Sequence, residues 1–110
     1  MNQDPIVDIA REIVRHIAAS RLDLLNYYPG RTTREELARA LREYGRTVVP
    51  LPDDGVAEID VFRPFPHEER WLVEFPLWTA EEGRSDLCLY LIVLEQDGRK
   101  VGYIDDIRVP

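Results

Sequence analysis

The stretch from Arg70 to Leu94 constrains the fold of this chain more than any other part of it. Its sequence, RWLVEFPLWTAEEGRSDLCLYLIVL, contains two apolar runs on either side of a short acidic segment. Large apolar side chains recur at every second position of both runs, which is the spacing of β-strands. We therefore expect two antiparallel strands joined by a loop. Many of the intervening positions are apolar as well, so this sheet is expected to be apolar on both faces.

Two more strands are expected around this pair. Asp97-Gly98 stands between apolar runs, and Asp-Gly in that position predicts a two-residue hairpin turn. The turn leads to a last strand from Lys100 to about Val109. Residues Val56–Phe62 alternate between apolar and polar types, which predicts a half-buried strand at an edge of the sheet. Val48-Val49 is a candidate for a further short strand.

The N-terminal part of the chain predicts two helices. Asp4-Pro5 joins a capping carboxylate to a proline at the first helical position, and apolar residues then recur at helical spacing up to Ile17. Thr33 and Glu36 have the spacing of a capping box at the start of a second helix. The segment Arg21–Tyr28 either extends the first helix or packs as a turn.

These elements predict a single α+β domain over residues 1–110. We expect two N-terminal helices packed on one face of a four-stranded antiparallel meander, in the order ααββββ. No apolar run approaches the roughly 20 residues of a membrane helix, so no membrane partner is expected. Cys88 is the only cysteine, which excludes an internal disulfide and fits a cytoplasmic protein.

The turn at Asp97-Gly98 also predicts which residues face each other across the last two strands. The expected pairs are Leu94 with Val101, Ile92 with Tyr103, and Tyr90 with Asp105. On the face assigned to the core, Gly102 lies in the row of Trp71, where a missing side chain makes room for the indole.

The face opposite the core, which we call the second face, gives the main indication of function. It carries Leu72, Trp78, Cys88, Tyr90, Ile92, Leu94, Val101 and Tyr103. A solvated antiparallel face normally alternates to polar residues, and a monomer rarely exposes a large apolar patch. The connector of residues 46–56, a ligand or a second copy of the chain is therefore expected to cover it. A homodimer that uses Leu72, Cys88, Ile92, Leu94, Val101 and Tyr103 is the leading hypothesis, and it makes the protein a non-catalytic interaction module.

One row of the second face is polar in this register. It places Glu74, Tyr90 and Asp105 side by side. Two carboxylates beside a phenol fit an acid/base pair or a cation site. We favour a structural interpretation, in which the row fixes the register inside an interface or its carboxylates reach solvent near the edge of the sheet. The alternative function is therefore a small enzyme with a cone-shaped pocket, in which Glu74 or Asp105 acts as base beside Tyr90.

The loop between the two central strands is dense in functional groups. A binding role is one interpretation for Trp78, Glu81, Glu82, Arg84 and Asp86; the other is a turn held by ion pairs and backbone caps. Asp105-Asp106 and the two histidines lack companions at metal-site spacing, so we predict no metal, cofactor or catalytic residue.

Charge is spread unevenly along the chain. Residues 1–50 hold seven acidic and eight basic side chains, whereas residues 51–110 hold fourteen acidic and six basic ones. The acidic sheet region argues against a nucleic-acid partner, which requires clustered Lys and Arg. It fits a basic protein partner, so an acidic inhibitor or immunity-type protein is a further hypothesis.

Two segments resemble a known family. Leu77–Leu87 (LWTAEEGRSDL) and Ile104–Val109 (IDDIRV) are similar to segments of uncharacterised bacterial domains of unknown function that carry a WTxEEGRSDL segment and an IDDIxV terminus. This resemblance covers the last third of the chain and implies no activity. The order of helices and strands also resembles cystatin-like and nuclear-transport-factor-2-like folds, which include enzymes, binding modules and dimerisation domains.

Overall fold

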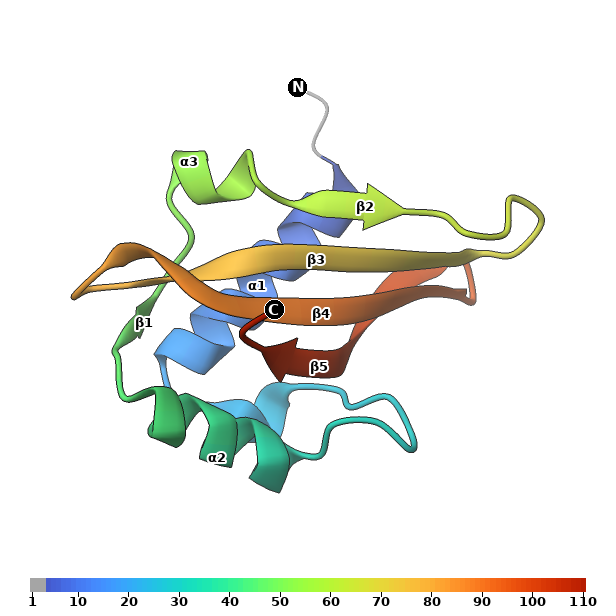
Figure 1. The fold of residues 1–110 in the computed structure, drawn as a ribbon. Coiled ribbons are helices and arrows are strands. Elements are labelled where there is room, and N and C mark those ends of the chain that lie inside the picture. The colour runs from blue at the N-terminus through green and yellow to red at the C-terminus, as the bar shows by residue number, and fades with distance from the viewer. Residues whose placement is uncertain (1–3) are drawn as a thin grey trace.

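The computed structural model describes residues 4–110 and shows an α+β fold (Figure 1). The helices are α1 (Pro5–Ala18), α2 (Arg34–Tyr44) and the single turn α3 (Asp53–Val56), with a 3-10 turn η1 at Leu22–Leu24. The strands are β1 (Val48–Val49), β2 (Asp60–Phe62), β3 (Arg70–Thr79), β4 (Gly83–Gln96) and β5 (Arg99–Arg108). The predicted class, helices followed by an antiparallel sheet, is confirmed. No helix within residues 4–110 has both the length and the apolar character needed to span a membrane.

The sheet is built on the long meander β3–β4–β5. Two short strands share the outer edge of β3, because β1 pairs with its end at Trp78–Thr79 and β2 pairs with residues 72–74. The hairpin between β4 and β5 is the predicted two-residue turn: Asp97 and Gly98 have φ angles of 52° and 77°, and Gln96 pairs with Arg99. Positive φ at both central residues is the geometry that matches the twist of the flanking strands.

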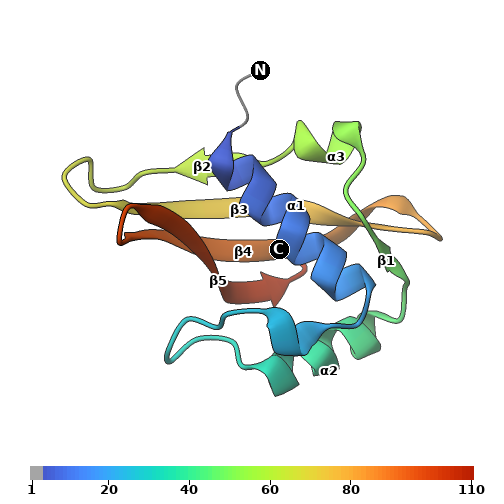
Figure 2. The same ribbon diagram turned by 180° about the vertical axis from the view of Figure 1, so that it is seen from behind.

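Helix α1 crosses the core face of the sheet, as Figure 2 shows. It begins as predicted, with the Asp4 carboxylate accepting a hydrogen bond from the Ile6 N–H at 2.9 Å. Its buried stripe is Ile6, Ala10, Ile13, Val14 and Ile17. The space at Gly102 is filled by this helix and not by the predicted indole, because a Cβ there would lie 2.4 Å from Cγ2 of Ile9.

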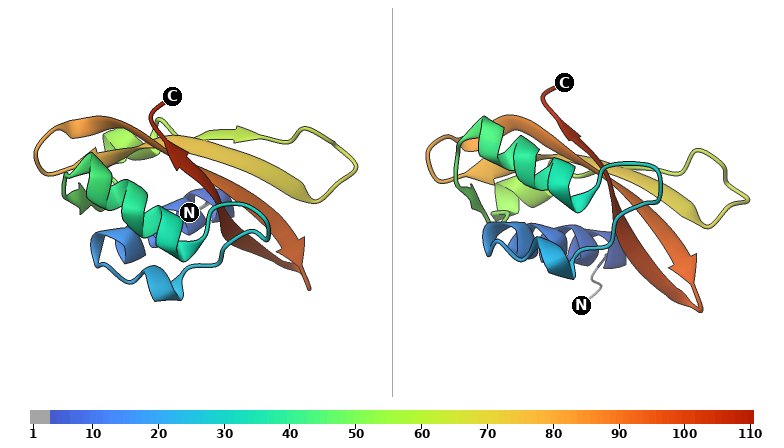
Figure 3. Two further views of the ribbon diagram at one scale, coloured as in Figure 1. Left: turned by 60° about the horizontal axis from the view of Figure 1, so that its bottom comes forward. Right: turned by 90° about the horizontal axis from the view of Figure 1, so that it is seen from below.

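Helix α2 lies alongside β5 (Figures 1 and 3). The capping box is present in full: Glu36 N–H donates to Thr33 Oγ1, and Thr33 N–H donates to the Glu36 carboxylate. Gly45 ends the helix in the left-handed conformation. Leu37 has no exposed surface and ties α2 to the core that α1 forms with the sheet.

The segment before α2 is neither a longer α1 nor a free linker. After η1 the chain runs beside the outer edge of β5, where Ile104 N–H donates to the Asn26 carbonyl at 2.8 Å and Tyr28 N–H donates to the Ile104 carbonyl at 3.0 Å. Tyr27 and Ile104 form a parallel bridge. This short contact protects one part of the β5 edge and leaves the part nearer the hairpin turn open.

The strand predicted over Val56–Phe62 is correct only for its last three residues. Val56 closes α3, and the next residues form turns, in which Glu58 N–H donates to the Gly55 carbonyl and Ile59 N–H to the Val56 carbonyl. Pro52 and the two aspartates after it favour a helical turn, since proline precedes the helix without losing a bond and carboxylates stabilise the first turn. That local preference overrides the alternating pattern.

Candidate functional site

The second face carries an apolar row that spans the sheet. Phe62, Leu72, Ile92 and Tyr103 are successive cross-strand neighbours from β2 to β5, and we call them the central row. The row continues beyond the sheet to Tyr28, whose ring meets that of Tyr103 edge-to-face at 6.0 Å. Its inner member Ile92 is 6% exposed, whereas Phe62 at the outer end is 47% exposed.

One end of the second face, where Trp78 of β3 and Cys88 of β4 lie, is covered by the chain itself. Trp78 lies against α3, since a Cβ at Gly55 would be 2.7 Å from its Nε1. That Nε1 is buried without a hydrogen-bond partner. The connector of residues 46–56, which is one of the segments expected to cover the second face, therefore lies over Trp78. The end of the described chain, Pro110, lies beside Cys88 on the same face (Figure 1).

The polar row beside the central row differs from the predicted one. It consists of Asp60, Glu74, Tyr90 and Asp106, because a β-bulge shifts the register of β5 between Tyr90 and Leu91. The predicted pairing of Tyr90 with Asp105 is therefore wrong.

Asp105, the extra residue of the bulge, holds the loop before α2. Its carboxylate accepts from Nε of Arg31 at 2.6 Å, and its carbonyl accepts from the N–H and the hydroxyl of Thr32. Bulged residues leave the ladder and redirect their side chains, which explains why a strict alternation misplaced it.

Tyr90 and Cys88 lie in a partly apolar environment. Burial raises the pKa of the Tyr90 phenol, and burial also raises the pKa of the Cys88 thiol. The guanidinium of Arg108 lies 4.2 Å from the centre of the Tyr90 ring and pairs with Asp106. Raised values keep both groups protonated at neutral pH, which is the opposite of what an activated nucleophile or base requires.

An open groove of about 370 Å³ lies over this part of the face. Glu58, Asp60, Glu74, Arg84 and Tyr90 are among the residues that line it. Glu58 and Arg84 form an ion pair across it. Asp60 and Glu74 are direct cross-strand neighbours, and within residues 4–110 neither has an ion-pair partner. Like charges directly opposite each other repel, so this pair leaves the groove with an excess of negative charge.

The acidic loop is fastened to the segment before β1 and to α2. Glu81 accepts hydrogen bonds from the N–H and the hydroxyl of Thr47, both at 2.8 Å, and these bonds lower the pKa of its carboxylate. Glu82 accepts from the hydroxyls of Thr79 and Tyr44. The Tyr44 hydroxyl in turn accepts from the Asp86 N–H at 3.3 Å. The carboxylates of Glu81 and Glu82 thus make internal contacts of the kind that the structural interpretation describes.

Ser85 caps backbone groups, which is the role that the structural interpretation of this loop gives to Ser85 or Asp86. The register of β3 and β4 shifts between Pro76 and Trp78, and Ser85 is buried at this irregularity. Its hydroxyl donates to the Leu77 carbonyl at 2.7 Å and accepts from the Leu87 N–H at 3.2 Å. The side chain replaces ladder bonds that the bulge removes.

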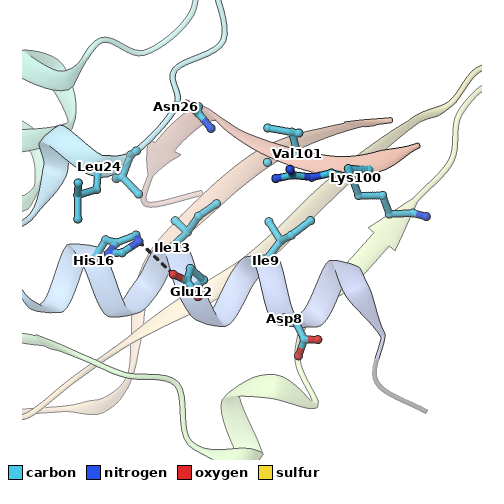
Figure 4. Close-up of a pocket in the computed structure, with 12 residues that line it drawn as sticks. Asp8, Ile9, Glu12, Ile13, His16, Leu24, Asn26, Lys100 and Val101 are labelled. Carbon is cyan, nitrogen blue, oxygen red and sulfur yellow. Dashed lines mark ion pairs between the residues drawn. The ribbon is translucent and has the colours of Figure 1, made fainter. Parts of the chain in front are cut away.

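A second concavity lies between α1 and β5, and we call it the α1–β5 groove (Figure 4). Its volume is about 310 Å³, and its lining includes Ile9, Glu12, Ile13, Asn26 and Val101. These residues come from three separate segments, so no local pattern in the sequence marks the site. Among residues 4–110 no group of three or more His, Cys, Asp or Glu side chains is arranged to hold a metal ion.

Comparison with known proteins gives one match. Neither the curated proteins nor the solved structures contain a significant match to this chain. The likeness to cystatin-like and nuclear-transport-factor-2-like folds therefore stays a prediction. A family model described as a domain of unknown function, DUF7668, matches residues 10–110. That match covers nearly the whole chain, well beyond the two segments that carried the resemblance, and the chain belongs to the DUF7668 family of domains of unknown function.

Proposed function

We propose that this domain is a non-catalytic interaction module that forms a homodimer through the second face. The central row carries this proposal: it is apolar from β2 to β5, and its outer residue Phe62 is 47% exposed. Burial of apolar surface is the main driving force of association. Leu94 and Val101, which pair on the next row of the same face, extend the apolar area.

Charge complementarity supports a second copy as the occupant. In β3, Glu74 lies two residues to one side of Leu72, and Arg70 lies two residues to the other side. A twofold axis along the central row places Glu74 of each copy opposite Arg70 of the other, because such an interface is isologous. Within residues 4–110, the ion-pair partner of Arg70 is the exposed Glu68 at 3.5 Å, and its guanidinium also lies 5.6 Å from the centre of the Phe65 ring. The dimer thus gains two equivalent ion pairs around an apolar centre.

The size of the face sets the expected affinity. Four strands at about 4.8 Å spacing and seven residues at about 3.3 Å rise give a surface of roughly 20 Å by 20 Å. This is smaller than the roughly 800 Å² per partner of a typical stable interface. We therefore expect a reversible dimer with a dissociation constant in the micromolar range. We also place the module in the cytoplasm, on the grounds of its single cysteine.

The charge pair provides the test. Sedimentation velocity across a wide concentration range measures the dimer of the unmodified chain. Glu74→Arg and Arg70→Glu should each give monomers, because each places like charges across the twofold axis. An equimolar mixture of the two variants should form a heterodimer, since both positions then hold opposite charges, one pair as in the unmodified chain and the other with its charges exchanged. Failure of the mixture to associate would reject this geometry.

A matched pair of exposed residues tests the apolar row. Phe62→Lys places a charge in the central row and should weaken the dimer by at least about tenfold. Val61→Lys changes the next residue, which is 40% exposed and points to the other side of β2. It should leave the dimer intact. Equal dimerisation by both variants would place the interface elsewhere.

One observation favours a second candidate. The excess negative charge of Asp60 and Glu74 in the open groove fits a basic protein partner, as expected of an acidic inhibitor or immunity-type protein. Retention of such a partner falls as salt rises, whereas the apolar dimer is less sensitive to salt. The enzyme alternative has less support, because the groove is open and Asp105, one of its two candidate bases, lies outside the polar row and is bound to Arg31.

A further inference from the structure

The edge of β5 nearest the hairpin turn has backbone groups without protein partners. Ile104 directs its N–H and C=O away from β4, toward Asn26 and Tyr28. In an antiparallel pair every second residue points the same way, and no register shift separates Ile104 from Lys100. Gly102 and Lys100 therefore also direct their N–H and C=O groups at the free edge. Within residues 4–110 no segment lies there to bond them.

The α1–β5 groove lies directly along this open edge. Its floor is apolar, with Ile9 and Ile13 pointing from α1 toward β5 (Figure 4). Asp8, Glu12 and His16 line the side formed by α1, with His16 Nε2 3.3 Å from the Glu12 carboxylate, and Arg99 and Lys100 line the side formed by β5. The end of the Lys100 side chain turns away from the groove, since its Nζ lies 4.9 Å from the centre of the Trp71 ring and 3.4 Å from the Glu95 carboxylate. The groove thus combines unpaired backbone groups of β5, an apolar floor and two carboxylates on α1.

We propose that this edge and groove bind an extended segment of a partner protein by strand addition to β5. Backbone groups of the segment bond Lys100 and Gly102, and one apolar side chain sits over Ile9 and Ile13. A Lys or Arg two residues away lies on the same side of the segment and reaches Glu12. Strand addition of this kind derives affinity from main-chain bonds and specificity from alternate side chains. This surface is separate from the second face, so the proposal does not depend on the dimer.

Two features favour a basic segment over a second copy of this chain. The β5 edge already accepts a short strand, because Tyr27 bridges Ile104 in parallel. Pairing of two β5 edges would bring Arg99 and Lys100 of both copies together, and like charges in a ladder repel each other. A segment whose Lys or Arg lies on the α1 side of the groove faces Asp8 and Glu12, on the side away from Arg99 and Lys100.

The probe is an acetylated and amidated hexapeptide, Thr-Lys-Thr-Ile-Thr-Lys, in which one isoleucine is flanked by lysines at every second position. NMR titration should show saturable binding with a dissociation constant below about 1 mM. The same peptide with Glu in place of Lys should bind at least about tenfold more weakly. A fully N-methylated form lacks the N–H donors and should not bind.

Amide hydrogen exchange gives the site-specific readout. In the free protein the N–H groups of Lys100 and Gly102 should exchange fast, whereas those of Val101 and Tyr103 are protected by β4. Saturation with the peptide should slow exchange at Lys100 and Gly102. Unchanged exchange at both amides, or no binding of the lysine peptide, would overturn the proposal. The amides of Lys100 and Gly102 could instead be protected without peptide, with a protection that increases with protein concentration. That result would assign the edge to a second copy of the chain and would also overturn the proposal.

Two variants of one residue separate the backbone bond from the side chain. Lys100→Pro removes an N–H that points away from β4, a position where edge strands tolerate proline. Lys100→Ala removes the same side chain and keeps the N–H. The proline variant should bind the peptide about fivefold more weakly than the alanine variant, the effect of one hydrogen bond. Equal binding by the two folded variants would exclude strand addition at this residue.

Discussion

The close approach of α1 to β5 at Gly102 makes a quantitative prediction. A Cβ added at this position would lie 2.4 Å from Cγ2 of Ile9 and 3.2 Å from Cδ1 of Ile13. Carbon atoms in contact are ordinarily about 3.5 to 4.0 Å apart, so the first distance is more than 1 Å too short. Ile9 is β-branched and has one strongly preferred rotamer in a helix, so its methyl group cannot swing aside. Helix α1 must shift as a whole.

We expect Gly102→Ala to lower the free energy of unfolding by about 2 kcal/mol. Inserting a methyl group into a packed core costs roughly 1 to 3 kcal/mol, and the better strand propensity of alanine offsets about 0.5 kcal/mol of this. Ile9→Ala removes the colliding methyl and should rescue the variant in part. The double variant should be more stable than the sum of the single effects by about 1 to 2 kcal/mol.

Urea unfolding followed by far-UV circular dichroism measures all four proteins of this cycle. The denaturant slope should be unchanged, so that midpoints report stability alone. Independent sites add within about 0.5 kcal/mol. Additive behaviour of Ile9→Ala and Gly102→Ala, or an unchanged stability of Gly102→Ala, would refute the packing of α1 on β5 at this position.

Three further predictions follow from single side chains. Ser85→Ala should cost about 2 to 4 kcal/mol in urea unfolding, because two buried backbone groups lose their partner, whereas Ser85→Thr keeps the hydroxyl and should cost less. The hydrogen bonds from Thr47 lower the pKa of Glu81 in the folded state. Ionised Glu81 therefore stabilises the fold at a pH above its unfolded-state pKa, and this stabilisation is lost as the pH falls through the folded-state pKa. Thermal melts between about pH 5 and pH 3 should therefore show a smaller loss for Glu81→Gln than for the unmodified chain. Burial raises the pKa of Cys88, so iodoacetamide should modify it more slowly at pH 8 than it modifies free cysteine; an equal rate would contradict the half-buried position.

Elements with local signals were predictable from the sequence. The cap at Asp4, the capping box at Thr33 and the turn at Asp97-Gly98 each depend on residues within four positions of one another, and each is confirmed. This turn alone predicted the cross-strand pairs of Leu94 with Val101 and of Ile92 with Tyr103, and the structure contains both. In such features the local chemistry agrees with the overall fold, so a short window of sequence is enough to predict them.

Features that depend on breaks in periodicity were not predictable in the same way. The bulge at Asp105 is held by Arg31, which lies 74 positions earlier in the chain. Strict alternation would turn Asp106 toward the core, which indicates either a bulge or a charged partner such as Arg84 or Arg108 and does not decide between them. The polar row is therefore assigned one residue out of register when the strand is continued without a bulge. The α1–β5 groove had no signal for a similar reason, because its floor and its open edge are brought together only when α1 packs on the sheet.

The contact between α1 and β5 has a consequence for biosynthesis. Helix α1 leaves the ribosome well before the strand against which it packs, because β5 ends only at Arg108. Its apolar stripe therefore stays without its partner while about ninety residues are made, a period in which exposed apolar surface promotes aggregation. The β3–β4–β5 meander needs only neighbouring segments and can pair as soon as it emerges. Nascent chains with this fold should accordingly need a chaperone to bind α1 until β5 has emerged from the ribosome.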